Sequence, residues 1–121
     1  EAMLKLKEMS LTSSEAYHAM EFRHGPMSMC DESAAVIALL SRERSDLERA
    51  VLNDIEPFGA REVTVGTSDE IPSQIPSWAA PSLYLLPLQL LALERALAKG
   101  LDPDHPRHLT AVIELDAAGA S

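Results

Sequence analysis

The chain of 121 residues is 46% hydrophobic and 24% charged, a composition that suits one small domain with a single core and argues against disorder. Its net charge of −9 disfavours a nucleic-acid backbone or an anionic membrane surface as a partner. Cys30 is the only cysteine, and no apolar run approaches the roughly 20 residues of a membrane helix, so we expect a soluble, cytoplasmic protein without an internal disulfide.

The first segment, residues 1–10, is rich in strong helix formers and is predicted to be helical. The pattern begins without an initiator methionine or a capping residue, which we interpret as a fragment whose N-terminal portion is missing. A connector at residues 11–14 precedes a short helical turn at residues 19–24. This turn should end at Gly25-Pro26, because glycine can cap a helix end and proline cannot continue one.

An uninterrupted apolar run at residues 34–40 predicts a parallel strand that is buried on both faces. A helix to about Glu56 should follow, capped by Ser41 or Ser45. Ser45 with Glu48 matches a capping box, in which each residue would bond the backbone of the other.

Three apolar residues, Leu47, Val51 and Ile55, are expected on the buried face of this helix, and Gly59 should close it. A second short strand is predicted at residues 62–65. The order strand, helix, strand is typical of a βαβ unit, so the fold class is α/β with a parallel sheet.

The rest of the chain combines loop and helix. Residues 66–81 are predicted to be mostly loop, with a brief edge strand at 71–75. A long apolar helix then runs to Lys99 and ends at Gly100, and Pro87 should kink it or mark its true start. A turn at residues 102–106 and an extended piece at residues 111–115 complete the prediction.

Three charged residues of the first helix, Glu1, Lys5 and Glu8, have the spacing i, i+4 and i+7, which puts them on one face. One interpretation is a solvated stripe whose ion pair contributes a few tenths of a kcal/mol. The alternative is an acid/base pair, because Lys5 and Glu8 lie one turn apart and can reach the same small substrate.

His24 stands beside the rigid Gly-Pro stop, where its imidazole could exchange a proton near neutral pH. A surface histidine or a satisfied core histidine is the competing interpretation. The other histidines show no metal spacing with His24 or with Cys30, so no zinc site is expected. The sequence contains no G-x-G-x-x-G, Walker or G-x-S-x-G motif, and no metal or organic cofactor is predicted.

Several ordered motifs together resemble a known family. They are EAMLKLKE at residues 1–8, EAY at 15–17, EFRHGP at 21–26, PLQLLA at 87–92 and KGLDPDHPRHL at 99–109. In this order they resemble the sugar-isomerase (SIS) domain of glutamine–fructose-6-phosphate aminotransferases and of the related SIS-type glucosamine-6-phosphate deaminases and phosphosugar isomerases.

The resemblance implies a flavodoxin-like, three-layer fold, in which residues 1–121 form the C-terminal part of a second SIS subdomain and residues 102–121 its tail. It implies an isomerase or deaminase acting on an amino-sugar or ketose 6-phosphate by proton transfer between C1 and C2. Glu8 would be the base, Lys5 its electrostatic partner and Glu1 a substrate-binding residue. His24 would assist ring opening in the active site of a neighbouring subunit, which implies a homodimer.

Two departures from the family pattern affect this expectation. The tail lysine that forms a Schiff base in the aminotransferases aligns with Ala111, which favours a deaminase or plain isomerase over an ammonia-transferring synthase. The family's Ser-x-Ser-Gly-x-Thr phosphate loop occurs nowhere in the sequence, so the chain alone should not turn over substrate. Two other classes stay open, a sugar-phosphate-sensing SIS module without chemistry and a structural domain whose match is accidental.

Overall fold

The computed structural model describes residues 1–66 and 74–107. In chain order the elements are helix α1 (Ala2–Ser10), helix α2 (Ala19–Arg23), 3-10 helix η1 (Pro26–Met29), strand β1 (Ala35–Leu39), helix α3 (Ser45–Ile55), 3-10 helix η2 (Glu56–Phe58), strand β2 (Arg61–Val65) and helix α4 (Ala80–Ala98).

The two strands form a parallel pair that α3 connects. The register runs from Ala35 opposite Arg61 to Leu39 opposite Val65, without a bulge. The βαβ unit and the parallel sheet that the sequence predicts are therefore confirmed. Gly59 ends the segment after α3 in a left-handed conformation, with a φ of 78°, which glycine adopts without a steric penalty.

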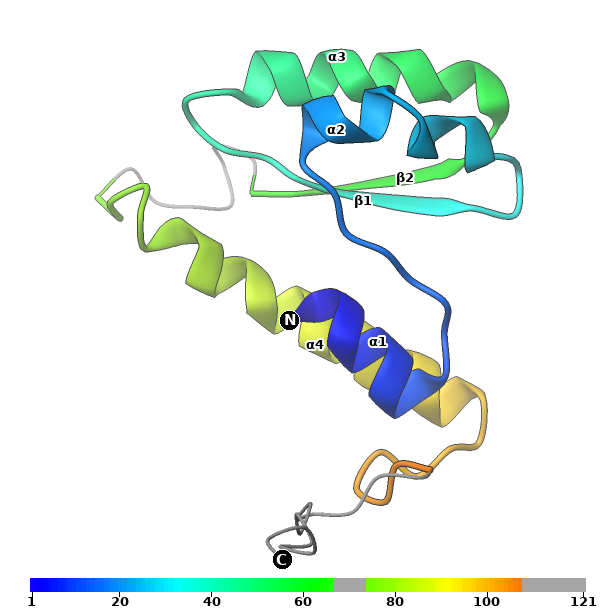
Figure 1. The fold of residues 1–121 in the computed structure, drawn as a ribbon. Helices are drawn as coiled ribbons and strands as arrows, with labels where there is room; N and C mark the ends of the chain where they lie inside the picture. Colours follow the sequence, from blue (N-terminus) through cyan, green and yellow to red (C-terminus); the bar gives the residue numbers. More distant parts are fainter. Residues whose placement is uncertain (67–73, 108–121) are drawn as a thin grey trace, which may run out of the picture.

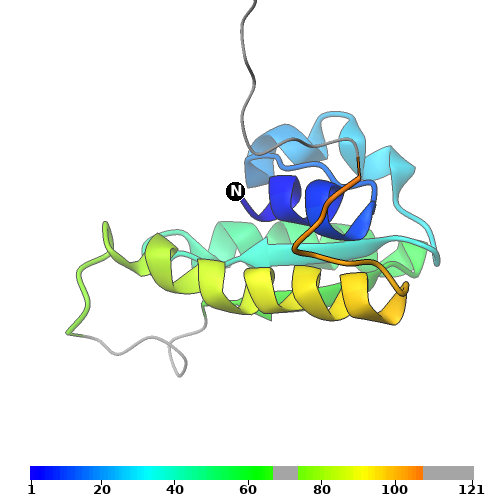
Figure 2. The same cartoon turned by 90° about the horizontal axis from the view of Figure 1, so that it is seen from below.

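The elements are arranged in three layers (Figure 1). Helices α2 and α3 lie on one side of the sheet, and α1 and α4 lie on the other. The view from below shows α1 and α4 side by side (Figure 2). They run in the same direction, because Ala2 packs near Tyr84 and Leu88 whereas Ser10 accepts a hydrogen bond from Lys99.

Helix α4 forms most of the core with a single stripe of residues. The buried members recur every four positions, as an α-helix requires for one face, and are Ala80, Tyr84, Leu88, Ala92 and Ala96. The first three pack against strand residues Ile37 and Val65. The last two are fully buried alanines. Their small side chains let another backbone approach closely, and α1 packs along this helix.

The expectation that residues 34–40 are buried on both faces is wrong. Leu40 is fully buried, but Leu39 is 44% exposed and Val63 of the neighbouring strand is 51% exposed. The apolar run predicted burial from composition alone. In the described residues the sheet has two strands, so each strand has an open edge and helices cover only part of its faces.

The capping predictions also need correction. Arg44 is the N-cap of α3 and no side chain caps the helix, so the Ser45–Glu48 capping box does not form. The Glu48 carboxylate instead accepts hydrogen bonds from the Ser41 backbone N–H at 2.6 Å and the Ser41 hydroxyl at 2.9 Å. This contact ties α3 to the end of β1. Leu47, expected on the buried face, is 55% exposed.

Gly25 does not provide a left-handed cap for α2, because its φ of 173° is extended and Pro26 begins a 3-10 helix at once. Helix α4 begins at Ala80 and continues through Pro87, so a start at Pro87 is wrong, while its end before Gly100 is as predicted.

The edge strand at 71–75 and the extended piece at 111–115 fall wholly or mainly outside the described residues. Within the described part of the chain, no helix combines the length and apolar character that crossing a membrane requires.

Candidate active site

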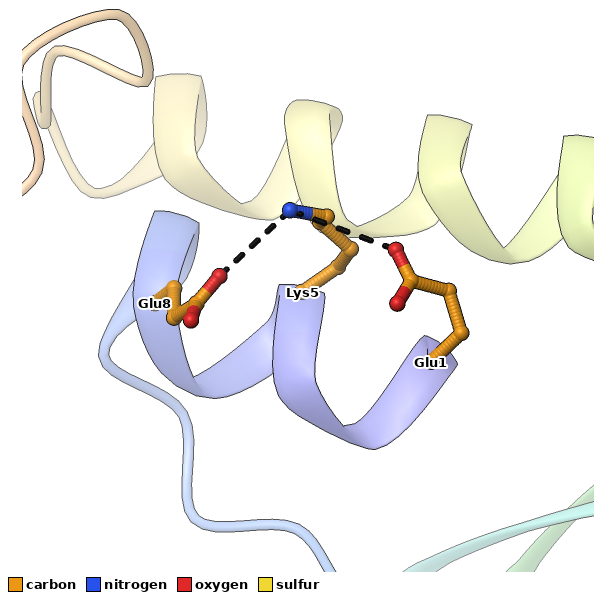
Figure 3. A network of polar contacts seen from close by, with 3 residues as sticks. All are labelled: Glu1, Lys5 and Glu8. Atoms are coloured by element: carbon orange, nitrogen blue, oxygen red, sulfur yellow. Dashed lines mark hydrogen bonds and ion pairs between the residues drawn. The ribbon is translucent and has the colours of Figure 1, made fainter. Parts of the chain in front are cut away.

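Three charged side chains lie along one face of α1 (Figure 3). Lys5 Nζ is 3.4 Å from Glu8 Oε2 and 4.0 Å from Glu1 Oε1, so the ammonium lies between two carboxylates. The side chains of Lys5 and Glu8 are 34% and 30% exposed. A pair this open to water adds only about 0.5 kcal/mol to stability, and it remains accessible to a bound molecule.

The Lys5–Glu8 pair lines an open cleft between α1 and α4. The cleft has a volume of about 420 Å³, within the range of small-molecule sites. Lining residues come from α1, α4 and the turn after α4: Lys5, Glu8, Met9, Leu86, Gln89, Leu90, Leu93, Pro103 and Pro106. Apolar carbons therefore surround one carboxylate, one ammonium and one amide.

This arrangement can support proton transfer at carbon. A carboxylate can remove a proton next to a carbonyl, and an adjacent cation can stabilise the enediolate oxygen that develops. The helical spacing of the sequence predicts that Lys5 and Glu8 lie one turn apart, and their charged atoms are 3.4 Å apart; the expected action on one substrate stays a prediction.

A smaller cavity lies at the carboxyl ends of the two strands, where α/β proteins often bind ligands. Its volume is about 60 Å³, and its lining includes Ser41, Gly66 and Tyr84. This cavity is much smaller than the cleft between α1 and α4. We therefore place the candidate site at the α1–α4 cleft.

His24 is not among the residues that line the described cleft. It is the exposed C-cap of α2, on the other side of the sheet from α1. An ion pair of 2.6 Å between Arg23 and Asp54 holds the end of α2 against α3. Within one chain the structure therefore brings Glu1, Lys5 and Glu8 together and leaves His24 apart. Its expected role across a subunit contact stays a prediction.

Within residues 1–66 and 74–107, no group of three or more His, Cys, Asp and Glu side chains is arranged to hold a metal ion. The pKa of the Cys30 thiol is raised, mainly by partial burial and also by the Asp31 charge. A raised pKa keeps the sulfur protonated, the form that is poor both as a nucleophile and as a ligand.

The turn after α4, which supplies two prolines to the cleft lining, also carries a histidine–aspartate pair. His105 Nδ1 is 2.8 Å from Asp102 Oδ2. The hydrogen bond to Asp102, with the Asp102 charge, raises the pKa of His105. In return, the hydrogen bond from His105 contributes most to lowering the pKa of Asp102. Both groups are exposed, so the pair orders the turn locally.

We expect Asp102→Asn to lower the pKa of His105 toward its ordinary value, measured by NMR titration of the imidazole. Because the pKa of His105 is raised, its ion pair with Asp102 stabilises the turn fully at pH values below the ordinary histidine pKa. This contribution is lost as the pH rises through the raised pKa. Asp102, with a lowered pKa, loses its contribution as pH falls through that pKa. Asp104→Asn is the control, because Asp104 acts on His105 only through its charge and should cause a smaller shift. An unchanged His105 titration in Asp102→Asn would contradict the pairing.

Sequence reasoning missed part of the cleft. Gln89, Pro103 and Pro106 line it, although the analysis of their motifs assigned them no role. No periodicity links residues 5–9 with residues 86–106, so only the packing of α1 on α4 could reveal this wall. Ala111 and the extended piece of the tail lie outside the described residues.

No protein-family model matches the chain. Among curated proteins, a glutamine–fructose-6-phosphate aminotransferase of Gluconobacter oxydans is 35% identical over 130 residues, which covers 96% of this chain and 21% of that protein. The chain therefore spans about a fifth of the length of the curated relatives it matches.

Two solved structures share the fold. Glucosamine-6-phosphate deaminase of Thermotoga maritima matches with a TM-score of 0.79 and 34% identity, covering 90% of this chain and 34% of that one. The C-terminal domain of a glucosamine-fructose-6-phosphate aminotransferase from Francisella tularensis matches with a TM-score of 0.75 and 29% identity, covering 87% and 33%.

Proposed function

Because the chain belongs to the SIS-domain phosphosugar isomerase family, we propose that its α1–α4 cleft is part of the active site of an isomerase or deaminase acting on an amino-sugar or ketose 6-phosphate. The observation that carries this proposal is the Lys5–Glu8 pair, with 3.4 Å between Nζ and Oε2, at the wall of a cleft of about 420 Å³. The same cleft is lined by apolar residues of α4 and of the turn that follows it, so the pair borders a concave surface that a small molecule could occupy.

In the proposed reaction the Glu8 carboxylate removes the proton from C2 of the open-chain aldose. The C2–H electron pair forms the C1–C2 double bond of an enediolate, while the carbonyl π electrons move to O1. Glu8 then returns the proton to C1, and the proton of the O2 hydroxyl passes to O1. The ketose that results has the same atoms as the aldose. The Lys5 ammonium stabilises the oxyanion during the step.

Two further parts of the proposal come from outside this cleft. His24 of the partner subunit would assist ring opening, which requires a homodimer. The phosphate group would be bound by residues other than those of this chain, since the sequence lacks the family's phosphate loop and carries a net charge of −9. Ala111 at the position of the tail lysine favours isomerisation or deamination over amino transfer from glutamine.

The test is to incubate the complete gene product that carries this chain with fructose 6-phosphate and with glucosamine 6-phosphate in deuterated water. Product sugars and released ammonia would be measured, together with deuterium at C1 and C2. We expect interconversion with deuterium uptake at these carbons. Tight binding without turnover would replace the proposal with a sensor module, and absence of binding to any sugar phosphate would favour a structural domain.

A further inference from the structure

The C-terminal ends of α1 and α4 meet at a cluster of polar side chains outside the cleft. Lys99, which follows α4, donates hydrogen bonds from Nζ to the Ser10 carbonyl at 2.7 Å, the Leu11 carbonyl at 3.2 Å and Thr12 Oγ1 at 2.9 Å. An ammonium group has three protons, so these acceptors use all of them. Arg95 Nε donates to the same Thr12 oxygen at 2.9 Å.

The hydroxyl groups of this cluster form a consistent network. Ser10, a fully buried polar residue, donates its hydroxyl proton to the Leu6 carbonyl at 2.6 Å. Thr12 can then donate to Ser10 Oγ, 2.8 Å away, while its two lone pairs accept from Arg95 and Lys99. The contacts cross more than 80 positions of sequence, so they join two helices that the chain itself does not hold together.

Lys99 supplies hydrogen-bond donors to the carbonyl groups at the C-terminal end of α1. The last carbonyls of a helix lack partners within the helix, and they carry the partial negative charge of its dipole. Leu11, the residue after α1, has a φ of 47° and is the only non-glycine with positive φ in the described ranges. This conformation costs a leucine about 1–2 kcal/mol. The ammonium binds the Leu11 carbonyl directly and so favours this strained turn.

The same lysine is linked to two parts of the candidate site: it binds the end of α1 in space, and it precedes residues 103–106 in sequence. Glu8 stands in the last turn of α1, two residues before Ser10, and α1 has only nine residues. After Gly100 the chain continues to Pro103 and Pro106, which line the same cleft as Glu8. Loss of the contact at Lys99 would therefore loosen both Glu8 and the turn that carries Pro103 and Pro106.

We propose that Lys99 is a positioning residue, which fixes the last turn of α1 and thereby holds the Glu8 carboxylate at the cleft. This role rests on the proposed function of Glu8, although the contact between the helix ends stands independently of it. Lys99 is not among the residues that line the cleft, so it acts through α1 and touches no substrate.

The test compares three variants of the complete gene product. Lys99→Met should lower kcat for isomerisation by about 10- to 100-fold and leave KM within about threefold, because a displacement near 1 Å is enough to misplace a base. Lys99→Arg keeps a charged donor and should recover most of the activity. Lys7→Met is the matched control, since Lys7 is an exposed lysine of α1 outside the cluster; it should behave as the wild type.

Hydrogen exchange provides a readout that does not need activity. In Lys99→Met the amides of residues 5–12 should exchange faster than in the wild type, whereas those of β1 and β2 should not. If Lys99→Met fails to fold, Thr12→Val is the substitute, because valine has a similar volume and lacks the hydroxyl that accepts from Lys99. The amides of residues 5–12 should again exchange faster, by a smaller factor.

The outcomes separate the two proposals. A wild-type protein without turnover on any sugar phosphate overturns the proposed function and the positioning role with it. An active wild type with an equally active Lys99→Met variant overturns the positioning role alone. Unchanged exchange at residues 5–12 would show that the lysine does not fix α1, whatever the activity.

Discussion

Glu8→Gln is expected to lower the rate of sugar-phosphate isomerisation by about a thousandfold, because general base catalysis contributes factors of this size. Glutamine keeps the shape of the side chain and loses the ability to accept a proton. Affinity for the sugar phosphate should stay within about threefold, since the loss of one charge in a half-exposed pair changes binding little. The measurement is kcat with fructose 6-phosphate, with binding followed by calorimetry on the same protein.

Glu94→Gln is the matched control for this experiment. It makes the same substitution on α4, beside Leu93 of the cleft wall, at a glutamate that is exposed and not among the lining residues. We expect wild-type kinetics from it. Full activity in Glu8→Gln would refute Glu8 as the base, and equal losses in both variants would indicate a general effect of charge.

The largest expected effect on stability is at Gly66, directly after β2. A Cβ placed there would lie 2.6 Å from Cζ of Tyr84 and 2.7 Å from the carbonyl oxygen of Leu40. These two groups are themselves joined by the hydrogen bond from Tyr84 Oη to the Leu40 carbonyl, at 2.6 Å, and cannot move apart freely. The backbone φ of 93° adds strain for any residue with a side chain. Gly66→Ala should therefore lower the free energy of unfolding by about 3 kcal/mol.

Substitutions at two other glycines distinguish the cost of backbone strain from the cost of the clash with Tyr84. Gly100 has a φ of 66° and open space around its Cβ position, so Gly100→Ala should show the backbone strain alone, about 1 kcal/mol. Gly25 is extended and has open space, so Gly25→Ala should be neutral or slightly stabilising, by less than about 1 kcal/mol. Urea denaturation of the three variants measures all of these values. Equal losses at Gly66 and Gly100 would show that the clash with Tyr84 is relieved.

Local patterns predicted the elements well and their surroundings poorly. The run of helix formers at residues 1–10 and the apolar run at residues 34–40 became α1 and β1, because periodicity and propensity are properties of a few neighbouring residues. The burial of β1 was wrong, because burial depends on elements that are distant in sequence. The capping box at Ser45 was wrong because Glu48 has another partner, seven positions before it. The Glu48 carboxylate accepts a hydrogen bond from Ser41, just after β1, instead of capping the N-terminus of its own helix.

The sequence by itself determined that Glu1, Lys5 and Glu8 share a face, because 3.6 residues per turn fix that relation in any α-helix. It also determined the α/β class, through the order of strand, helix and strand. Only the tertiary structure decided that this face borders a cleft, since Gln89 and Pro103 come from segments that reach α1 by packing. The contact of Lys99 with Ser10 has the same origin: it bridges 89 positions, a distance at which spacing along the chain carries no information about proximity in space.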